Sequence, residues 1–177
     1  LSILPGILGY LQARREREMQ EIFELLSTRE TYFFRESYQL DAFREVLLPQ
    51  LQKRRPRGNQ LSVWSAGCAS GEEPYSMAIT LLDQFPDAAR YDVKLLATDI
   101  DPNILKKARA GVYNDEAVSP IPSASRDRWL ARDRDAGDRS WRVKDDVRAL
   151  ITFKELNLIG SWPMQGKFDV IFCRNVV

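Results

Sequence analysis

The sequence predicts an α/β fold in which helices cover both faces of a parallel sheet. Two observations carry this prediction. Short apolar runs of strand length alternate with amphipathic stretches of 10 to 15 residues, and glycine, proline or a capping residue marks each transition. With 177 residues, of which 44% are hydrophobic and 29% charged, the chain can form one domain with a core and a small appendage.

Helices are expected at the beginning of the chain. Apolar residues recur at spacings of three, four and seven over residues 8–26, and charged residues occupy the other faces. A second helix is expected over residues 38–47, with Pro49 near its end.

A polar, turn-rich joint follows over residues 53–59, where four basic residues surround a proline and a glycine. The spacing of apolar residues changes after this joint. We therefore expect a helical N-terminal region and linker over residues 1–55, and the main domain over residues 56–177.

The sequence of the main domain predicts alternating strands and helices. The expected elements are a strand at 61–66, a turn at 67–71, a helix at 72–85, a strand at 93–98, a helix from Asp101-Pro102 to Gly111, an irregular excursion with short helices at 114–146, and strands at 150–153 and 168–173. Trp129, Leu130, Trp141 and Val143 are the expected anchors of the excursion. Because the last strand would leave an apolar edge, we expect an incomplete sheet and a native protein that continues past Val177.

Composition excludes several classes of function. Twenty-six Lys and Arg balance 25 Asp and Glu, so the net charge of the chain does not favour binding to nucleic acid or to an anionic membrane. Two Cys and no His argue against a disulfide scaffold, a metal site, and Ser-His-Asp or Cys-His chemistry. No apolar run approaches the ~20 residues of a membrane span, and the start lacks the basic flank of a signal peptide. We expect a cytoplasmic protein without membrane insertion.

The turn between the first strand and its helix has the form of a cofactor cradle. Gly67 and Gly71 allow close backbone approach, and free amides at the helix start face the site. The turn has no Walker lysine and does not match GxGxxG. Glu72 and Glu73 at the helix start argue against a phosphate, although the alternative that both only complement the helix dipole stays open.

An acidic residue follows the second main-domain strand. Asp99 is placed where a carboxylate accepts hydrogen bonds from both hydroxyls of a ribose. Asp101 is better explained as the N-cap of the helix that begins at Pro102. Together, the turn and Asp99 describe a site for a ligand with an adenosine-like ribose and a cationic group, which S-adenosylmethionine fits.

The chain resembles the CheR family of chemotaxis protein methyltransferases, which methylate receptor glutamates. The segments that carry the resemblance are Thr31–Glu36, Trp64–Ser76, Ala97–Asp101, Lys107–Tyr113, Asn157-Leu158 and Phe168–Asn175. They follow the order that the family has. The resemblance implies a class I, Rossmann-like methyltransferase fold, S-adenosylmethionine as cofactor with S-adenosylhomocysteine as product, and the cytoplasmic domain of a chemoreceptor as protein substrate.

The resemblance also implies a set of site residues. The expected cofactor-binding residues are Thr31, Arg35, Gly67, Glu73, Asp99, Asn157, Leu158, Arg174 and Asn175. Arg35 is in addition the candidate catalytic residue. The planar forks of donors on Arg35 and Arg174 suit a carboxylate of the cofactor or of the incoming glutamate. One position departs from the family pattern: Arg29 stands where its members usually carry Asn.

The implied chemistry needs no general base. A glutamate side chain with a pKa of ~4.3 is already an anion at neutral pH, so the protein has to align it with the methyl group and exclude water. Two alternatives stay open. One is a methyltransferase of the same fold that acts on a small molecule, and the other is a non-catalytic cofactor-binding scaffold or sensor in a signalling complex.

Overall fold

The computed structural model describes residues 14–15, 31–54, 61–85, 88 and 92–174. The chain divides into two compact units, Leu1–Glu30 and Thr31–Val177, and the fold described below is that of the second unit. Most of the helix expected over residues 8–26 lies outside the described residues. Arg29 and Asn175 lie outside them as well.

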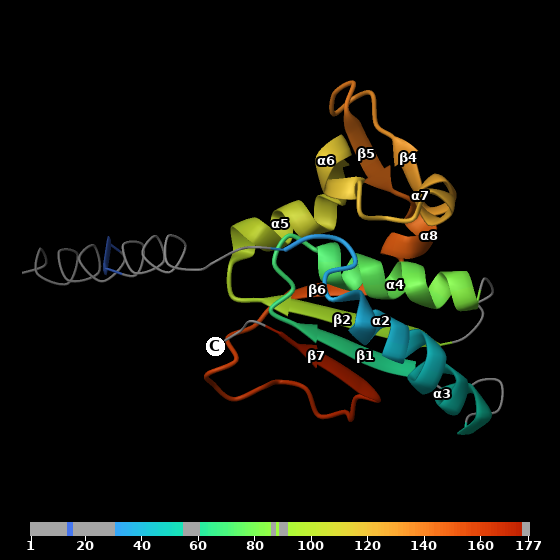
Figure 1. The fold of residues 1–177 in the computed structure, drawn as a ribbon. Coiled ribbons are helices and arrows are strands. Elements are labelled where there is room, and N and C mark those ends of the chain that lie inside the picture. The colour runs from blue at the N-terminus through green and yellow to red at the C-terminus, as the bar shows by residue number, and fades with distance from the viewer. Residues whose placement is uncertain (1–13, 16–30, 55–60, 86–87, 89–91, 175–177) are drawn as a thin grey trace, which may run out of the picture. The chain divides into compact units, whose positions relative to one another are not determined.

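The second unit consists of two small sheets and the helices around them (Figure 1). Its elements in chain order are α2 (Ser37–Ala42), the π-helix η1 (Phe43–Leu47), α3 (Leu48–Arg54), β1 (Leu61–Ala66), α4 (Glu72–Gln84), β2 (Val93–Asp99), α5 (Pro102–Ala110), β3 (Val112–Asn114), α6 (Asp115–Val118), α7 (Ser123–Trp129), β4 (Leu130–Arg132), β5 (Ser140–Val143), α8 (Asp145–Arg148), β6 (Ile151–Glu155) and β7 (Val170–Cys173). Among the described residues, no helix is both long and apolar enough to cross a membrane.

The predicted parallel sheet is confirmed. Its strand order is β6-β2-β1-β7, and every neighbouring pair is parallel. The chain adds β2 and then β6 on one side of β1 and returns to add β7 on the other side. The order therefore reverses between β1 and β7, and ligands of open parallel sheets bind at such a point, beyond the carboxyl ends of the strands.

One face of the sheet is covered by α4, α5 and η1. Ser65 of β1 donates a hydrogen bond to Glu73 of α4, and Tyr75 of α4 donates one to the carbonyl of Ala108 on α5. The ring of Phe43 on η1 meets Phe172 of β7, which pairs with Ser65 in the sheet.

The opposite face carries Trp64. This ring packs at 5.0 Å from Trp162 and 5.3 Å from Phe168, measured between ring centroids. The segment between β6 and β7 therefore covers the sheet at Trp64.

The helices of residues 37–54 belong to the same compact unit as the sheet. Leu40, Phe43 and Leu48 are buried in one hydrophobic core with residues of β1 and α4. This packing explains why the boundary between the two compact units lies after Glu30 rather than near residue 55. The boundary of a separate N-terminal domain at residue 55 stays a prediction.

The helix expected to end near Pro49 continues as α3 to Arg54. A proline inside a regular α-helix removes one backbone hydrogen bond, and its ring meets the carbonyl four residues earlier. Here the π-helical turn of η1 directly precedes α3. Because a π turn changes the spacing of the carbonyls, the ring of Pro49 meets a carbonyl arrangement that differs from that of a regular α-helix.

The excursion over residues 114–146 is more regular than expected. It holds α6, α7 and the beginning of α8, and its strands β4 and β5 form an antiparallel sheet with β3 in the order β3-β5-β4. Three of the expected anchors, Trp129, Leu130 and Val143, are buried. Trp141 is partly buried and donates a hydrogen bond of 2.7 Å to Asp115. Strands of three or four residues are too short for a pattern of alternation, so the sequence did not predict this sheet.

Candidate cofactor site

Most of the residues expected to bind the cofactor lie at one edge of the parallel sheet. Gly67 follows β1, Asp99 ends β2, Asn157 and Leu158 lie just after β6, and Arg174 follows β7. Because the four strands are parallel neighbours, their carboxyl ends share this edge. The backbone N–H of Leu156 donates to the carbonyl of Asp99 at 2.9 Å, which joins the segment after β6 to the end of β2.

The glycine turn is folded back on the end of β2. Gly67 has a φ of 74°, and its N–H donates to the carbonyl of Thr98 at 2.8 Å. Gly71, the N-cap of α4, has a φ of 100°. A Cβ at Gly71 would lie 2.9 Å from the Tyr113 hydroxyl and 3.1 Å from the Ala108 side chain. The absence of a side chain at Gly71 therefore serves packing within the protein, which differs from the expectation that both glycines make room for a ligand.

Asp99 is held by two backbone amides. Its Oδ2 accepts from the N–H of Ala69 at 2.9 Å, and its Oδ1 accepts from the N–H of Asp101 at 3.0 Å. A carboxylate offers about four acceptor positions, so two remain for the hydroxyls of a ribose. The N-cap assignment of Asp101 is confirmed, since its Oδ1 accepts from the N–H of Asn103 at 2.8 Å.

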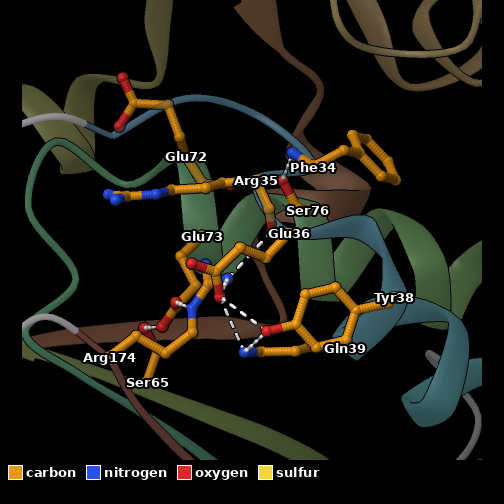
Figure 2. A network of polar contacts seen from close by, with 10 residues as sticks. All are labelled: Phe34, Arg35, Glu36, Tyr38, Gln39, Ser65, Glu72, Glu73, Ser76 and Arg174. Carbon is orange, nitrogen blue, oxygen red and sulfur yellow. Dashed lines mark hydrogen bonds and ion pairs between the residues drawn. The ribbon is translucent and has the colours of Figure 1, made fainter.

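Glu73 and Arg174 contact each other near the point between β1 and β7 where the strand order reverses (Figure 2). One carboxylate oxygen of Glu73 accepts from the Ser65 hydroxyl at 2.7 Å, and the other accepts from Nε of Arg174. Nη1 of Arg174 also donates to the carbonyl of Arg35 at 2.9 Å and lies 3.6 Å from the Glu36 carboxylate. Arg174 thus connects β7, α4 and the segment before α2, and both charges of the pair are largely buried.

Arg35 lies on a tight turn before α2. Its N–H donates to the carbonyl of Tyr32 at 3.3 Å, and its guanidinium carbon lies 5.8 Å from the centre of the Tyr32 ring. Figure 2 shows this guanidinium extending away from the Glu73–Arg174 contact. Thr31 precedes the turn and is partly exposed.

The segment after β6 forms a turn of its own. The side-chain oxygen of Asn157 accepts from the N–H of Ile159 at 2.9 Å, and the carbonyl of Leu158 accepts from the Trp162 indole at 3.2 Å. These contacts are those of a turn residue. The role of Asn157 and Leu158 near an adenine stays a prediction.

Glu72 differs from Glu73 in its environment. Its carboxylate is buried and accepts a hydrogen bond of 2.7 Å from the Ser70 hydroxyl. Burial raises the pKa of Glu72 above its usual value, and the hydrogen bond from Ser70 opposes that rise. Glu72 is therefore more than an exposed partner of the helix dipole.

The raised pKa of Glu72 predicts how stability changes with pH. The native state keeps the proton at pH values where the unfolded chain has released it, so the free energy of unfolding falls as pH rises above the unfolded-state value. Glu72→Gln removes this dependence and keeps an acceptor for Ser70. We expect the variant to gain stability relative to the wild type as the pH rises above about 4.3, the usual pKa of a glutamate in an unfolded chain, measured by urea unfolding. Glu116→Gln, at an exposed position, is the control, and an equal gain there would contradict the role of burial.

Two serines take part in the site although neither is among the site residues that the sequence predicts. Ser65 lies inside the apolar strand β1 and is fully buried, and Ser76 lies on α4 and is 1% exposed. The signal for Ser65 was present, because a buried hydroxyl within an apolar strand needs a partner. Ser76 carried no such signal, since its partner Phe34 is 42 residues away in the sequence.

The chain matches a known family over most of its length. Residues 29–177 match the family described as CheR methyltransferase, SAM binding domain. A probable chemotaxis protein methyltransferase of Rhizobium etli is 47% identical over 158 residues, which are 89% of this chain and 59% of that protein.

Other relatives show the same coverage. Chemotaxis protein methyltransferase 2 of Vibrio cholerae is 36% identical over 175 residues, or 97% of this chain and 59% of that protein. A chemotaxis protein methyltransferase of Borreliella burgdorferi is 36% identical over 164 residues, or 90% of this chain and 57% of that protein. This chain thus spans less than two thirds of the length of these relatives. The extent of the match shows that the chain belongs to the CheR methyltransferase family and contains its S-adenosylmethionine-binding domain.

Proposed function

We propose that this chain binds S-adenosylmethionine at the carboxyl edge of its parallel sheet. We further propose that the protein transfers the methyl group to glutamate side chains in the cytoplasmic domains of chemoreceptors, with glutamate methyl esters as products. The observation that carries it is the fixed carboxylate of Asp99 beside the glycine turn, with two acceptor positions left for a ribose. The family membership and the printed names of the relatives support this function over the small-molecule and scaffold alternatives.

The bound cofactor would supply a methyl group activated by a sulfonium. The residues of the chain have to bind and orient rather than transfer protons, because the accepting glutamate is already anionic at neutral pH. Asp99 would hold the ribose, while Glu73 would keep the charge of Arg174 balanced so that it does not oppose a cationic ligand. Arg35 would align a carboxylate of the cofactor or of the incoming glutamate.

A methyl-transfer assay tests the activity. Protein from the complete gene is incubated with S-adenosylmethionine labelled in the methyl group and a cytoplasmic fragment of a chemoreceptor. We expect label in the receptor fragment that alkali releases as methanol, as methyl esters require. Label that resists alkali would contradict ester formation, and the absence of transfer to any receptor fragment of the source organism would contradict the proposed substrate. Because this proposed substrate is the cytoplasmic domain of a receptor, a cytoplasmic location is part of the same proposal.

The ribose role of Asp99 predicts a loss of cofactor affinity in Asp99→Ala. Removing hydrogen bonds to a charged group costs about 1–3 kcal/mol, so the affinity for S-adenosylmethionine or S-adenosylhomocysteine should fall by about fivefold to 150-fold in calorimetry. Asp169→Ala is the matched control, because Asp169 also accepts from a backbone N–H, that of Ser62, but at the amino end of β1. Equal affinities of Asp99→Ala and Asp169→Ala would contradict the ribose role.

A further inference from the structure

The backbone around Arg35 is held in an unusual conformation. Phe34 has a φ of 57° and Glu36 a φ of 51°, and neither is glycine. Residues with side chains adopt this left-handed region at a cost, and they keep it where the surrounding structure fixes them. Arg35 therefore lies between two strained residues, and the contacts that hold the turn determine where its side chain begins.

Ser76 of α4 makes one of these contacts. Its hydroxyl donates to the carbonyl of Glu72 at 2.6 Å, within the helix, and accepts from the N–H of Phe34 at 2.9 Å. Because the hydroxyl proton is used within the helix, an oxygen lone pair faces the turn. Ser76 is 1% exposed, so water cannot take over the role of its hydroxyl.

The turn is also held on the other side of Arg35. The carbonyl of Arg35 accepts from Nη1 of Arg174, and the Glu36 carboxylate accepts from the side-chain amide of Gln39 at 2.8 Å. The preceding ring of Phe33 is fully buried and meets Tyr113 edge to face at 4.8 Å. Figure 2 shows Ser76 and Arg174 approaching the turn from different elements.

We propose that Ser76 is a positioning residue for Arg35. The Ser76 hydroxyl fixes the N–H before Arg35 while Arg174 fixes its carbonyl, so the direction of the Arg35 side chain is set by α4 and β7 together. This inference rests on the proposed function, in which Arg35 contacts the cofactor or the glutamate. It adds a residue that touches neither and acts through Arg35.

The chain offers a matched control on the same helix. Thr80 of α4 is buried, and its hydroxyl donates to the carbonyl of Ser76 at 2.8 Å, one turn earlier, as Ser76 does to Glu72. Thr80→Val removes a hydroxyl with the same contact within the helix. A general effect of losing such a contact would appear in both Thr80→Val and Ser76→Ala, whereas an effect on the turn would appear in Ser76→Ala alone.

The experiment measures S-adenosylhomocysteine affinity by calorimetry in Ser76→Ala, Arg35→Ala and the double variant. Ser76→Ala should lower the affinity by about twofold to tenfold, the effect of one hydrogen bond, and Thr80→Val should leave it unchanged. In the Arg35→Ala background, Ser76→Ala should cause no further loss. Hydrogen exchange without ligand gives an independent measurement: the amide of Phe34 should exchange faster in Ser76→Ala than in Thr80→Val.

Several results would overturn the proposal. Wild-type affinity in Ser76→Ala would do so, and an equal loss in both backgrounds would show that Ser76 acts independently of Arg35. Unchanged exchange of Phe34 would show that Ser76 does not hold the turn. A wild-type chain that binds neither S-adenosylhomocysteine nor S-adenosylmethionine would instead contradict the proposed function, and the exchange of Phe34 would still decide whether Ser76 fixes the turn.

Discussion

Glu73→Ala should lower the free energy of unfolding by about 3–5 kcal/mol, the cost of breaking a buried ion pair by removing one partner. Glu73 is 8% exposed, and the side chain of Arg174 is 14% exposed. Without the carboxylate, the guanidinium of Arg174 keeps its charge in a site that water reaches poorly. The fully buried hydroxyl of Ser65 loses its acceptor as well.

Urea unfolding measures this loss, and a surface pair provides the control. Arg148 and Asp145 form an ion pair of 3.0 Å in which the Asp145 side chain is 93% exposed. Asp145→Ala should cost less than about 1 kcal/mol, as exposed pairs do. If Glu73→Ala costs no more than Asp145→Ala, the pair contributes little to the stability of the fold. A double variant that also carries Arg174→Ala should recover part of the loss, because the guanidinium that lost its buried partner is then gone.

Much of the parallel sheet could be predicted because its strands are short apolar runs between clear turn signals. Leu61–Ala66 begins and ends as expected, and the helix after Asp101 ends at Gly111 as expected. The antiparallel sheet of β3, β4 and β5 could not be predicted. Its strands have three or four residues and are stabilised by contacts between distant parts of the chain.

The candidate site also has a part that could be predicted from the sequence and a part that could not. The position of residues next to strand ends, such as Gly67 and Asp99, could be predicted because parallel strands place their carboxyl ends at one edge. The contact between Glu73 and Arg174 joins residues 101 positions apart, and no local pattern reports such a pairing. The sequence therefore indicated which residues gather at the edge, but not which of them neutralise each other.

Gly71 shows how a motif residue can have a different physical role from the one that its pattern suggests. Its φ of 100° is strained for any residue with a side chain, at a cost of about 1–3 kcal/mol. An added Cβ would also lie 2.9 Å from the Tyr113 hydroxyl and 3.2 Å from the backbone of Ala108. Overpacking of this kind costs about 1–3 kcal/mol more. Gly71→Ala should therefore lower the free energy of unfolding by about 2–6 kcal/mol.

Two further variants separate strain from overlap in this prediction. Gly166→Ala is the control, because a Cβ at Gly166 meets nothing within 4 Å, and it should change stability by less than about 1 kcal/mol. Tyr113→Phe removes the atom nearest to the added Cβ, together with a hydrogen bond of 2.7 Å to the carbonyl of Ser70. In urea unfolding, Gly71→Ala should cost less in the Tyr113→Phe background than in the wild type, since the overlap with the hydroxyl is relieved while the strain at φ remains. An identical cost in both backgrounds would assign the whole effect to the backbone and to Ala108.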